Sequence, residues 1–273
     1  MLTDARSSVK LFGVADSLLT RPVMWRRLLA EFLGTGLLVT VIVGSGIAAQ
    51  RLSPGDVGLQ LFENSTATAF GLAVLILMFG PVSGAHFNPV VSLADWFVGR
   101  RARRGLRLDD IAAYVTAQVS GAICGAVLAN AMFDVPTELS TKHRLTGGHL
   151  LGEAVATAGL IALIFMLARS HRPALSAPAV GAYIGAAYWF TSSTAFANPA
   201  VTIGRMFSNT FAGIAPSSVP AFIGLQLVGA VIGLAVVLAL YPDASANAAD
   251  VVVPHATAPS ARSDSDRSIS PRT

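Results

Sequence analysis

Six long apolar segments dominate this 273-residue chain and restrict what it can fold into. Hydrophobic residues make up 53% of the sequence and charged residues only 12%, roughly half of what soluble domains carry. A helix that spans a bilayer needs about 20 apolar residues, with a range of about 17–25. The pattern therefore predicts an all-α membrane protein with six transmembrane helices. The segments lie near 28–50, 65–82, 110–133, 149–169, 175–192 and 218–241.

Basic residues gather in the connections between these segments. Five arginines lie within 99–109, two more within 169–174, and three, Arg21, Arg26 and Arg27, lie directly before the first apolar segment. If six spans alternate, these three groups share one side of the membrane with both chain termini. Because positive charge favours the cytoplasmic side, we expect both termini in the cytoplasm and the chain in the plasma (inner) membrane. The basic residues that give the chain its net charge of +4 are therefore interpreted as orienting it in the bilayer. No nucleic acid partner is expected.

The two ends of the chain differ in composition from its centre. Residues 1–24 are mixed and polar, and Ala, Ser, Pro, Asp and Arg dominate from about 243 onward. The stretch 243–273 has little apolar surface to bury, which predicts a disordered cytoplasmic tail. We therefore expect a cytoplasmic N-terminal segment over 1–24, one membrane domain over 25–242 and the tail over 243–273.

The membrane domain contains an internal repeat, with one copy over about 26–133 and the other over about 149–241. Each copy holds three spans, so two copies in tandem must lie in opposite orientations. Such an inverted repeat tends to place a pore or binding site at the midplane. Glycines four apart at matching places in both copies predict closely packed helices. The matching stretches are AEFLGT (30–35) with GEAVAT (152–157), SGAHFNPV (83–90) with STAFANPA (193–200), and QVSGAICG (118–125) with QLVGAVIG (226–233).

Two Asn-Pro elements at matching repeat positions, Asn88-Pro89 and Asn198-Pro199, are the most informative motifs. Asparagine is a strong N-cap and proline is favoured in the first helical turn, so each element predicts a helix start. About ten residues follow each one, too few to span, so two half-helices would meet near the middle of the membrane. Their facing N-termini repel cations, while the two asparagine amides can donate hydrogen bonds to a passing oxygen. This arrangement predicts a pore for neutral solutes.

With these motifs the chain resembles the aquaporin (major intrinsic protein) family over roughly 26–241, and specifically its aquaglyceroporin-like bacterial members. The resemblance implies a right-handed bundle of six helices plus two re-entrant half-helices, assembled as a homotetramer with one pore per subunit. It implies that Glu31 and Glu153 are buried carboxylates that accept hydrogen bonds from the re-entrant loops. The remaining pore-supporting residues that it implies are His86, Pro89, Val90, Pro199 and Ala200.

The chain departs from the family pattern at two positions. Val90 stands where members carry alanine, a small change in packing where the half-helices should touch. Typical members carry an arginine straight after the second Asn-Pro-Ala, where it forms the narrow outer filter, and here that position is Val201. The change removes a positive charge and several donors and frees volume. Arg205 lies one helical turn beyond Val201, and whether it partly substitutes is left open.

The resemblance places three further residues in the outer filter. One is Ala195, three residues before Asn198. The other two come from the second and fifth spans, and we predict Phe70 and Tyr188. A count without a gap gives Thr68 and Ala186 instead. On either count the filter is more apolar than a water-selective one.

The leading hypothesis is a passive channel for small uncharged solutes, including glycerol-like polyols and water. Family members with an altered filter are associated with glycerol or with metalloid acids such as arsenite. An alternative keeps the channel but lets ions or oxyanions pass, because the charge barrier is altered. A membrane enzyme or structural protein is less favoured, since the sequence lacks Gly-x-Ser-x-Gly, His-Glu-x-x-His and phosphate-loop motifs. No catalytic residue, cofactor or metal site is expected. The expected partners are small neutral solutes and membrane lipid. Cys124 is predicted to be a small packing residue.

Overall fold

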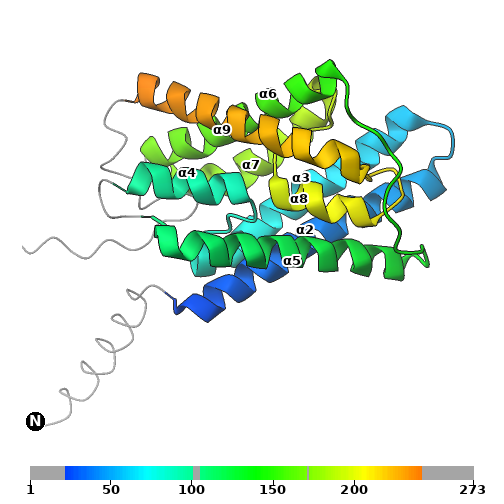
Figure 1. Cartoon of the computed structure of the whole chain (residues 1–273), viewed down its shortest axis with the longest axis horizontal. Helices are drawn as coiled ribbons and strands as arrows, with labels where there is room; N and C mark the ends of the chain where they lie inside the picture. The colour runs from blue at the N-terminus through cyan, green and yellow to red at the C-terminus, as the bar shows by residue number, and fades with distance from the viewer. Residues whose placement is uncertain (1–21, 101–104, 171, 242–273) are drawn as a thin grey trace, which may run out of the picture. The chain divides into compact units, whose positions relative to one another are not determined.

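A computed structural model describes residues 22–100, 105–170 and 172–241. The predicted cytoplasmic tail and most of the predicted N-terminal segment lie outside the described residues, as do three of the arginines within 99–109. Within the described ranges all regular structure is helical (Figure 1). The α-helices are α2 (Met24–Leu52), α3 (Val57–Ser83), α4 (Pro89–Gly99), α5 (Leu108–Met132), α6 (Gly147–Arg169), α7 (Ser176–Phe190), α8 (Pro199–Gly204) and α9 (Val219–Leu240).

Five of the described helices, α2, α3, α5, α6 and α9, are long and apolar enough to cross a membrane. The predicted segment at 175–192 forms the shorter helix α7, which has 15 residues. A 3₁₀ turn at Pro173–Leu175 leads directly into it. α7 packs against both α3 and α6, so it belongs to the same bundle as the longer helices.

Helix α3 begins eight residues before the apolar segment that predicts it, because polar side chains stabilise its first turns. The Asp56 carboxylate caps the helix by accepting a hydrogen bond from the backbone N–H of Leu59 at 2.9 Å. Further along, the buried amide of Asn64 donates to the carbonyl of Ile42 in α2 at 2.8 Å. The start of this span therefore depends on partners that lie far away in the sequence.

Glycines allow two pairs of helices, α2 with α5 and α6 with α9, to pack backbone against backbone. A Cβ atom added to Gly121 would lie 2.2 Å from the carbonyl oxygen of Phe32, and one added to Gly229 would lie 2.4 Å from that of Ala154. Real side chains do not tolerate such distances. The close packing predicted from the repeated glycine spacing is thus confirmed in both halves.

Two short helices, α4 and α8, begin at the Asn-Pro elements and lie between α5 and α9 (Figure 1). Each central asparagine caps its helix, since Asn88 Oδ1 accepts from the N–H of Val90 and Asn198 Oδ1 from that of Ala200. α4 has 11 residues, but α8 has only six before the chain tightens into a 3₁₀ turn at Arg205–Phe207. The second half-helix is therefore shorter than the ten residues expected.

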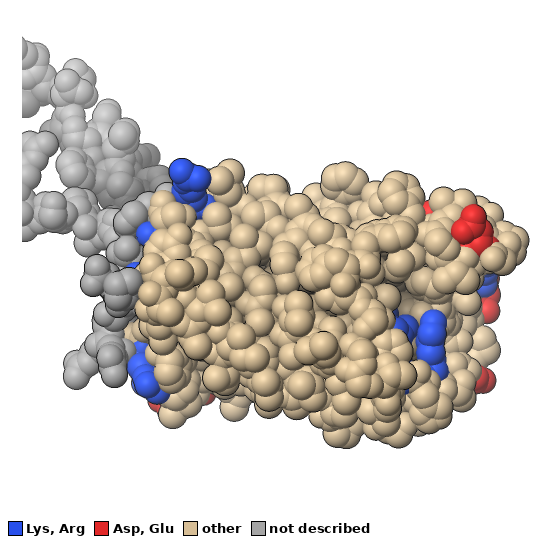
Figure 2. Space-filling model, turned by 90° about the horizontal axis from the view of Figure 1, so that it is seen from above, with Lys and Arg blue, Asp and Glu red and all other residues tan. Residues whose placement is uncertain are grey.

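The outer surface is suited to a bilayer. On the face shown in Figure 2, charged side chains lie toward the two ends, and an uncharged band separates them. Large apolar side chains are exposed along the helices, among them Phe70, Leu77, Met78, Leu151 and Val231. We call the end where α2 begins and α4 ends the basic end, and the end formed by the loops 133–146 and 208–218 the loop end.

Candidate functional site

A narrow cavity passes between the two Asn-Pro elements. Its volume is about 60 Å³, whereas one water molecule needs roughly 10–15 Å³ of such space, so it holds only a short file of small molecules. Of the residues predicted to form the pore, Asn88, Asn198, Ala195, Tyr188 and Val201 line it, as does His86.

The wall of the cavity is mostly apolar. Four helices, α2, α3, α6 and α7, supply pairs of aliphatic side chains to it. These side chains can neither donate nor accept a hydrogen bond, so a solute meets polar groups at only a few points. The pairs are Leu38 and Ile42, Leu72 and Ile76, Leu160 and Ile164, and Val180 and Ile184.

The two central asparagines connect the halves of the molecule. The Nδ2 of Asn88 donates to the carbonyl of Ala197 at 2.8 Å, and the Nδ2 of Asn198 donates to that of Phe87 at the same distance. An amide nitrogen carries two hydrogens, so each asparagine retains one more donor after these bonds. Both side chains line the cavity, and the retained donors are available to a solute oxygen.

The loops before the asparagines hold an unusual backbone conformation. Ala85 and Phe87 in the first loop, and Ala195 and Ala197 in the second, all have φ of 48°. Residues with a side chain seldom adopt this left-handed region, and each instance costs about 1–3 kcal/mol. Left-handed residues alternate with others in both loops, so side chains from outside the loops must stabilise this conformation.

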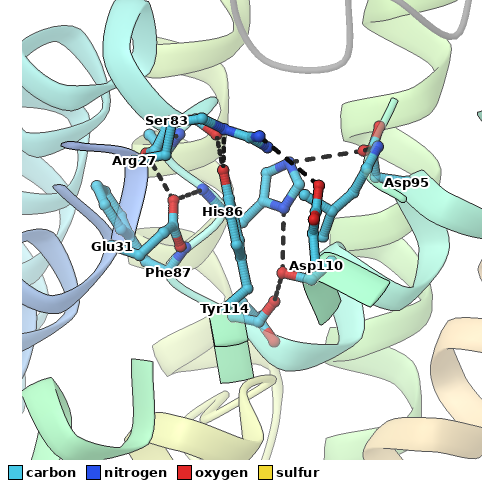
Figure 3. A network of polar contacts seen from close by, with 12 residues as sticks. Arg27, Glu31, Ser83, His86, Phe87, Asp95, Asp110 and Tyr114 are labelled. Carbon is cyan, nitrogen blue, oxygen red and sulfur yellow. Dashed lines mark hydrogen bonds and ion pairs between the residues drawn. The ribbon is translucent and has the colours of Figure 1, made fainter. Parts of the chain in front are cut away.

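Glu31 of α2 supports the first loop. Its buried carboxylate accepts hydrogen bonds from the backbone N–H groups of His86 at 3.0 Å and Phe87 at 2.7 Å (Figure 3). It also accepts from the Ser83 hydroxyl at 2.6 Å and from the Gln118 amide at 2.7 Å. The four donors satisfy a carboxylate that would otherwise be very costly to bury.

Glu153 of α6 supports the second loop in the same way. Its carboxylate accepts from the backbone N–H groups of Phe196 and Ala197, both at 2.9 Å, and from the Gln226 amide at 2.6 Å. Both glutamates are fully buried. They therefore occupy the places, and make the loop contacts, that the sequence analysis expects.

A polar network extends from the first loop to the basic end (Figure 3). The His86 Nδ1 lies 3.0 Å from the Ser92 hydroxyl, and its Nε2 lies 4.0 Å from Oδ2 of Asp95. Asp95 is buried and also accepts a hydrogen bond from the N–H of Leu106 at 2.6 Å. Sequence reasoning missed Asp95, although it is the one acidic residue in an otherwise apolar half-helix.

The network continues from Ser83 to α2 and α5. The Tyr114 hydroxyl donates to the Ser83 carbonyl at 3.0 Å and accepts from Nε of Arg27 at 2.9 Å. The Arg27 guanidinium lies 3.8 Å from the Asp110 carboxylate (Figure 3). At the basic end, the buried Arg27 side chain is thus paired with a carboxylate.

The loop end is built differently. The Arg205 guanidinium carbon lies 3.4 Å from the ring centroid of Phe196, and Nε donates to the carbonyl of Ala212. The Arg144 guanidinium lies 5.2 Å from the same ring, and its Nε donates to the Gly213 carbonyl at 3.0 Å. Burial lowers the pKa of Arg144 to about 10, so it stays charged at neutral pH. Sequence reasoning missed Arg144, which lies in a polar loop without a motif.

The structure corrects the prediction for the α3 position of the filter. Phe70 is 71% exposed on the outside of the bundle, whereas Thr68 is buried and lines the cavity. Two residues along a helix are about 200° apart, so these side chains point to opposite faces. The Thr68 hydroxyl lies 3.2 Å from that of Tyr188. Ala186, the other α7 candidate, is exposed.

The pore-supporting residues of the half-helices lie behind the cavity. Pro89, Pro199 and Ala200 are buried. Val90 is fully buried but faces a groove between α4 and α9, so its extra methyl groups do not line the cavity.

Two further predictions concern metals and Cys124. Within the described ranges, no three His, Cys, Asp or Glu side chains gather closely enough to hold a metal ion. Cys124, predicted to be a small packing residue, is exposed and does not pack inside the bundle of this chain. The side chain lies on the outward face of α5, where an apolar run alone cannot distinguish a lipid-facing side chain from an interior one.

Comparisons with known proteins give consistent results. The sequence profile of a family described as major intrinsic protein matches residues 18–192. The aquaglyceroporin AqpS of Rhizobium meliloti (strain 1021) is 52% identical over 211 residues, covering 77% of this chain and 88% of the relative. The glycerol uptake facilitator protein of Pseudomonas aeruginosa is 39% identical over 114 residues, covering 41% and 37%. The X-ray structure of the aquaglyceroporin from Plasmodium falciparum shares the fold, with a TM-score of 0.56 and 19% identity over 81% of this chain and 99% of that one.

Proposed function

We infer, from the premise that this chain belongs to the major intrinsic protein family, that it forms a membrane channel for glycerol and other small uncharged solutes. The observation that carries the inference is the narrow cavity with two asparagine amides at its centre and an apolar wall. The relatives named as an aquaglyceroporin and a glycerol uptake facilitator support the same solute class.

A solute would cross by exchanging hydrogen bonds at a few fixed points. As a solute oxygen passes between Asn88 and Asn198, the second hydrogen on each Nδ2 donates to it and so replaces a hydrogen bond that the solute made to water. Elsewhere the aliphatic wall offers no partner, so the solute is held weakly and leaves quickly. The N-termini of α4 and α8 carry partial positive charge beside this point, which opposes cations.

The residues toward the loop end favour solutes larger than water. Val201 presents methyl groups at the cavity, and Ala195 is small. We propose that the space beside these two small side chains admits polyols, with water and uncharged metalloid acids such as arsenous acid as further permeants. The relatives compared above give no support to the alternative pore for ions or oxyanions.

Assembly and location are proposals of the same kind. We propose a homotetramer in the plasma membrane with one pore per subunit and both termini in the cytoplasm. The basic residues at the basic end support this orientation through the preference of positive charge for the cytoplasmic side. We also propose that the chain has no enzymatic activity and that its polar network positions the pore loops.

The function is tested by reswelling of proteoliposomes after an osmotic shock with glycerol, urea or arsenous acid. We expect protein-dependent reswelling in glycerol and a silent bilayer under voltage. Thr68→Val should change the glycerol rate, while the matched control Phe70→Leu, on the outside of the same helix, should leave it unchanged. Liposomes that reswell no faster with protein than without it, in every solute, would refute the channel function.

A further inference from the structure

Arg205 is a buried cationic side chain at the loop end of the cavity. It is only 2% exposed, and it lies seven residues after Asn198, where α8 gives way to a 3₁₀ turn. It lines the cavity together with Val201 and Tyr188. Because Val201 offers only methyl groups, the polar character of this end depends on Arg205 and on the hydroxyls of Tyr188 and Thr68.

The contacts of Arg205 fix its guanidinium without using its outer nitrogens. Nε donates to the carbonyl of Ala212, and the guanidinium stacks 3.4 Å from the ring centroid of Phe196. A guanidinium has five N–H donors, and Nε supplies only one of them. In the described part of the chain, the two terminal nitrogens have no acceptor. The terminal nitrogens are not among the fully buried atoms that lack a partner, and Arg205 lines the cavity, so these four N–H groups are open to a molecule inside it.

The charge of Arg205 is also not balanced at the cavity. Among the described lining residues there is no aspartate or glutamate, and Glu153, the carboxylate that acts on Arg205 from behind the cavity, already accepts three hydrogen bonds, while Arg144 and Lys142 add further positive charge. The matching residue in the first half gives the contrast. Asp95 lies seven residues after Asn88, but it is paired with His86 and a backbone N–H.

We propose that Arg205 determines the selectivity of the channel at the loop end. Its terminal N–H groups donate to a hydroxyl oxygen of the passing solute, and its fixed charge opposes the entry of cations, including hydrated protons. The solute class is small neutral molecules with several oxygen acceptors, such as polyols. The inference rests on the proposed channel function and adds the residue that selects the solute.

The test compares Arg205→Gln, Arg205→Lys and the control Lys142→Gln in proteoliposomes. Lys142→Gln removes a charge from an exposed side chain of the neighbouring loop that does not line the cavity. Two quantities are measured: proton flux, from a trapped pH dye, and the ratio of glycerol to propane-1,2-diol flux, which compares solutes differing by one hydroxyl.

Arg205→Gln should raise proton flux by at least about 10-fold, since a unit charge at 4 Å is worth several kcal/mol at the protein surface and the half-helix termini still oppose cations. It should lower the glycerol to diol ratio by about 3- to 10-fold, as expected for a lost bond to a charged donor. Arg205→Lys should lower the ratio but keep protons out. Lys142→Gln should match the native protein in both quantities.

Three results would overturn the proposal. Native protein without glycerol flux refutes the channel function and this inference together. Native glycerol flux with a folded Arg205→Gln variant that is proton-tight and has an unchanged ratio refutes the role of Arg205 alone. If Arg205→Gln does not fold, an unchanged ratio in Arg205→Lys has the same meaning, because lysine cannot reproduce the planar donor geometry of arginine.

Discussion

The two halves of this molecule use equivalent positions for different chemistry. Seven residues after its central asparagine, the first half carries Asp95 and the second carries Arg205. Two residues before that asparagine they carry His86 and Phe196. In the first half the pair is a histidine beside a carboxylate, 4.0 Å apart, and in the second it is a guanidinium stacked on a ring at 3.4 Å.

The comparison separates what both halves must share from what may differ. Both use a buried glutamate to hold a strained loop, and both aim an asparagine amide at the loop of the other half. These features build the centre of the cavity and are nearly symmetric. The His86–Asp95 and Arg205–Phe196 pairs lie toward its two ends. The inverted repeat thus combines a nearly symmetric centre of the cavity with a basic end and a loop end that differ from each other.

The largest effect should come from breaking the shared support. Glu31→Ala and Glu153→Ala each leave two backbone N–H groups of a strained loop unsatisfied, so each should lower the free energy of unfolding in detergent by roughly 3–5 kcal/mol. Glu31→Ala should be the more severe, because Glu31 accepts one further bond from Ser83. Thermal melting of both variants checks the order, and equal or reversed losses would contradict it.

A smaller loss of stability should follow from removing the Asp95 carboxylate of the first half. Asp95→Ala deprives the Leu106 N–H of its acceptor and removes the carboxylate that lies 4.0 Å from His86 Nε2, and it should cost about 1.5–3 kcal/mol of stability. Asp95→Asn keeps an acceptor oxygen and should lose less than half of that amount. Denaturant titration of the two variants distinguishes them, and an asparagine variant as unstable as the alanine variant would refute the acceptor role.

The equivalent change in the second half should be smaller again. Phe196→Leu removes the ring under the Arg205 guanidinium, a desolvated cation–π contact worth about 1–2 kcal/mol. Phe62→Leu is the control, because Phe62 is an exposed ring that contacts no cation among the described residues, and it should stay within about 0.5 kcal/mol of the native protein. Equal melting temperatures for the two variants would show that the stacking contributes nothing.

The smallest effect concerns pH at the loop end. Although part of the Lys142 side chain is exposed, burial of the rest and then the charges of Arg144 and Arg205 lower the Lys142 pKa to about 8. Between that value and the usual 10.5 the unfolded chain binds more protons, so stability should rise with pH over this window. The gain should stay below about 1 kcal/mol because water screens the group. Lys142→Gln should flatten the rise, and an equal slope in both proteins would contradict the assignment.

Much of the centre of the site could be predicted from the sequence. The Asn-Pro elements, the two glutamates and Ala195 are tied to motifs that recur in both halves, so their places follow from the repeat. Phe70 was wrong because the loop between α3 and Asn88 fixes the rotation of the helix, and the length of that loop had to be assumed. The count without a gap gives Thr68, and the side-chain directions in the folded bundle decide in its favour by placing it at the cavity.

The side-chain pairs at the two ends of the cavity could not be predicted from the sequence. Asp95 and His86 are nine residues apart, as are Arg205 and Phe196, and each pair meets only because a strained loop reverses the chain. One signal was available, since aligning the two halves places Asp95 opposite Arg205. That alignment identifies two charged positions but not their partners, which depend on tertiary packing.

The central claim, that Val201 leaves room for a polyol at the loop end of the cavity, is tested most directly by Val201→Arg. Glycerol and water permeability are measured by stopped-flow light scattering on native and variant proteoliposomes. A second guanidinium one turn before Arg205 should lower glycerol permeability by at least about 10-fold, with water permeability retained, because the added side chain fills the space over Ala195 and Tyr188. Unchanged glycerol permeability in a folded variant would contradict the account.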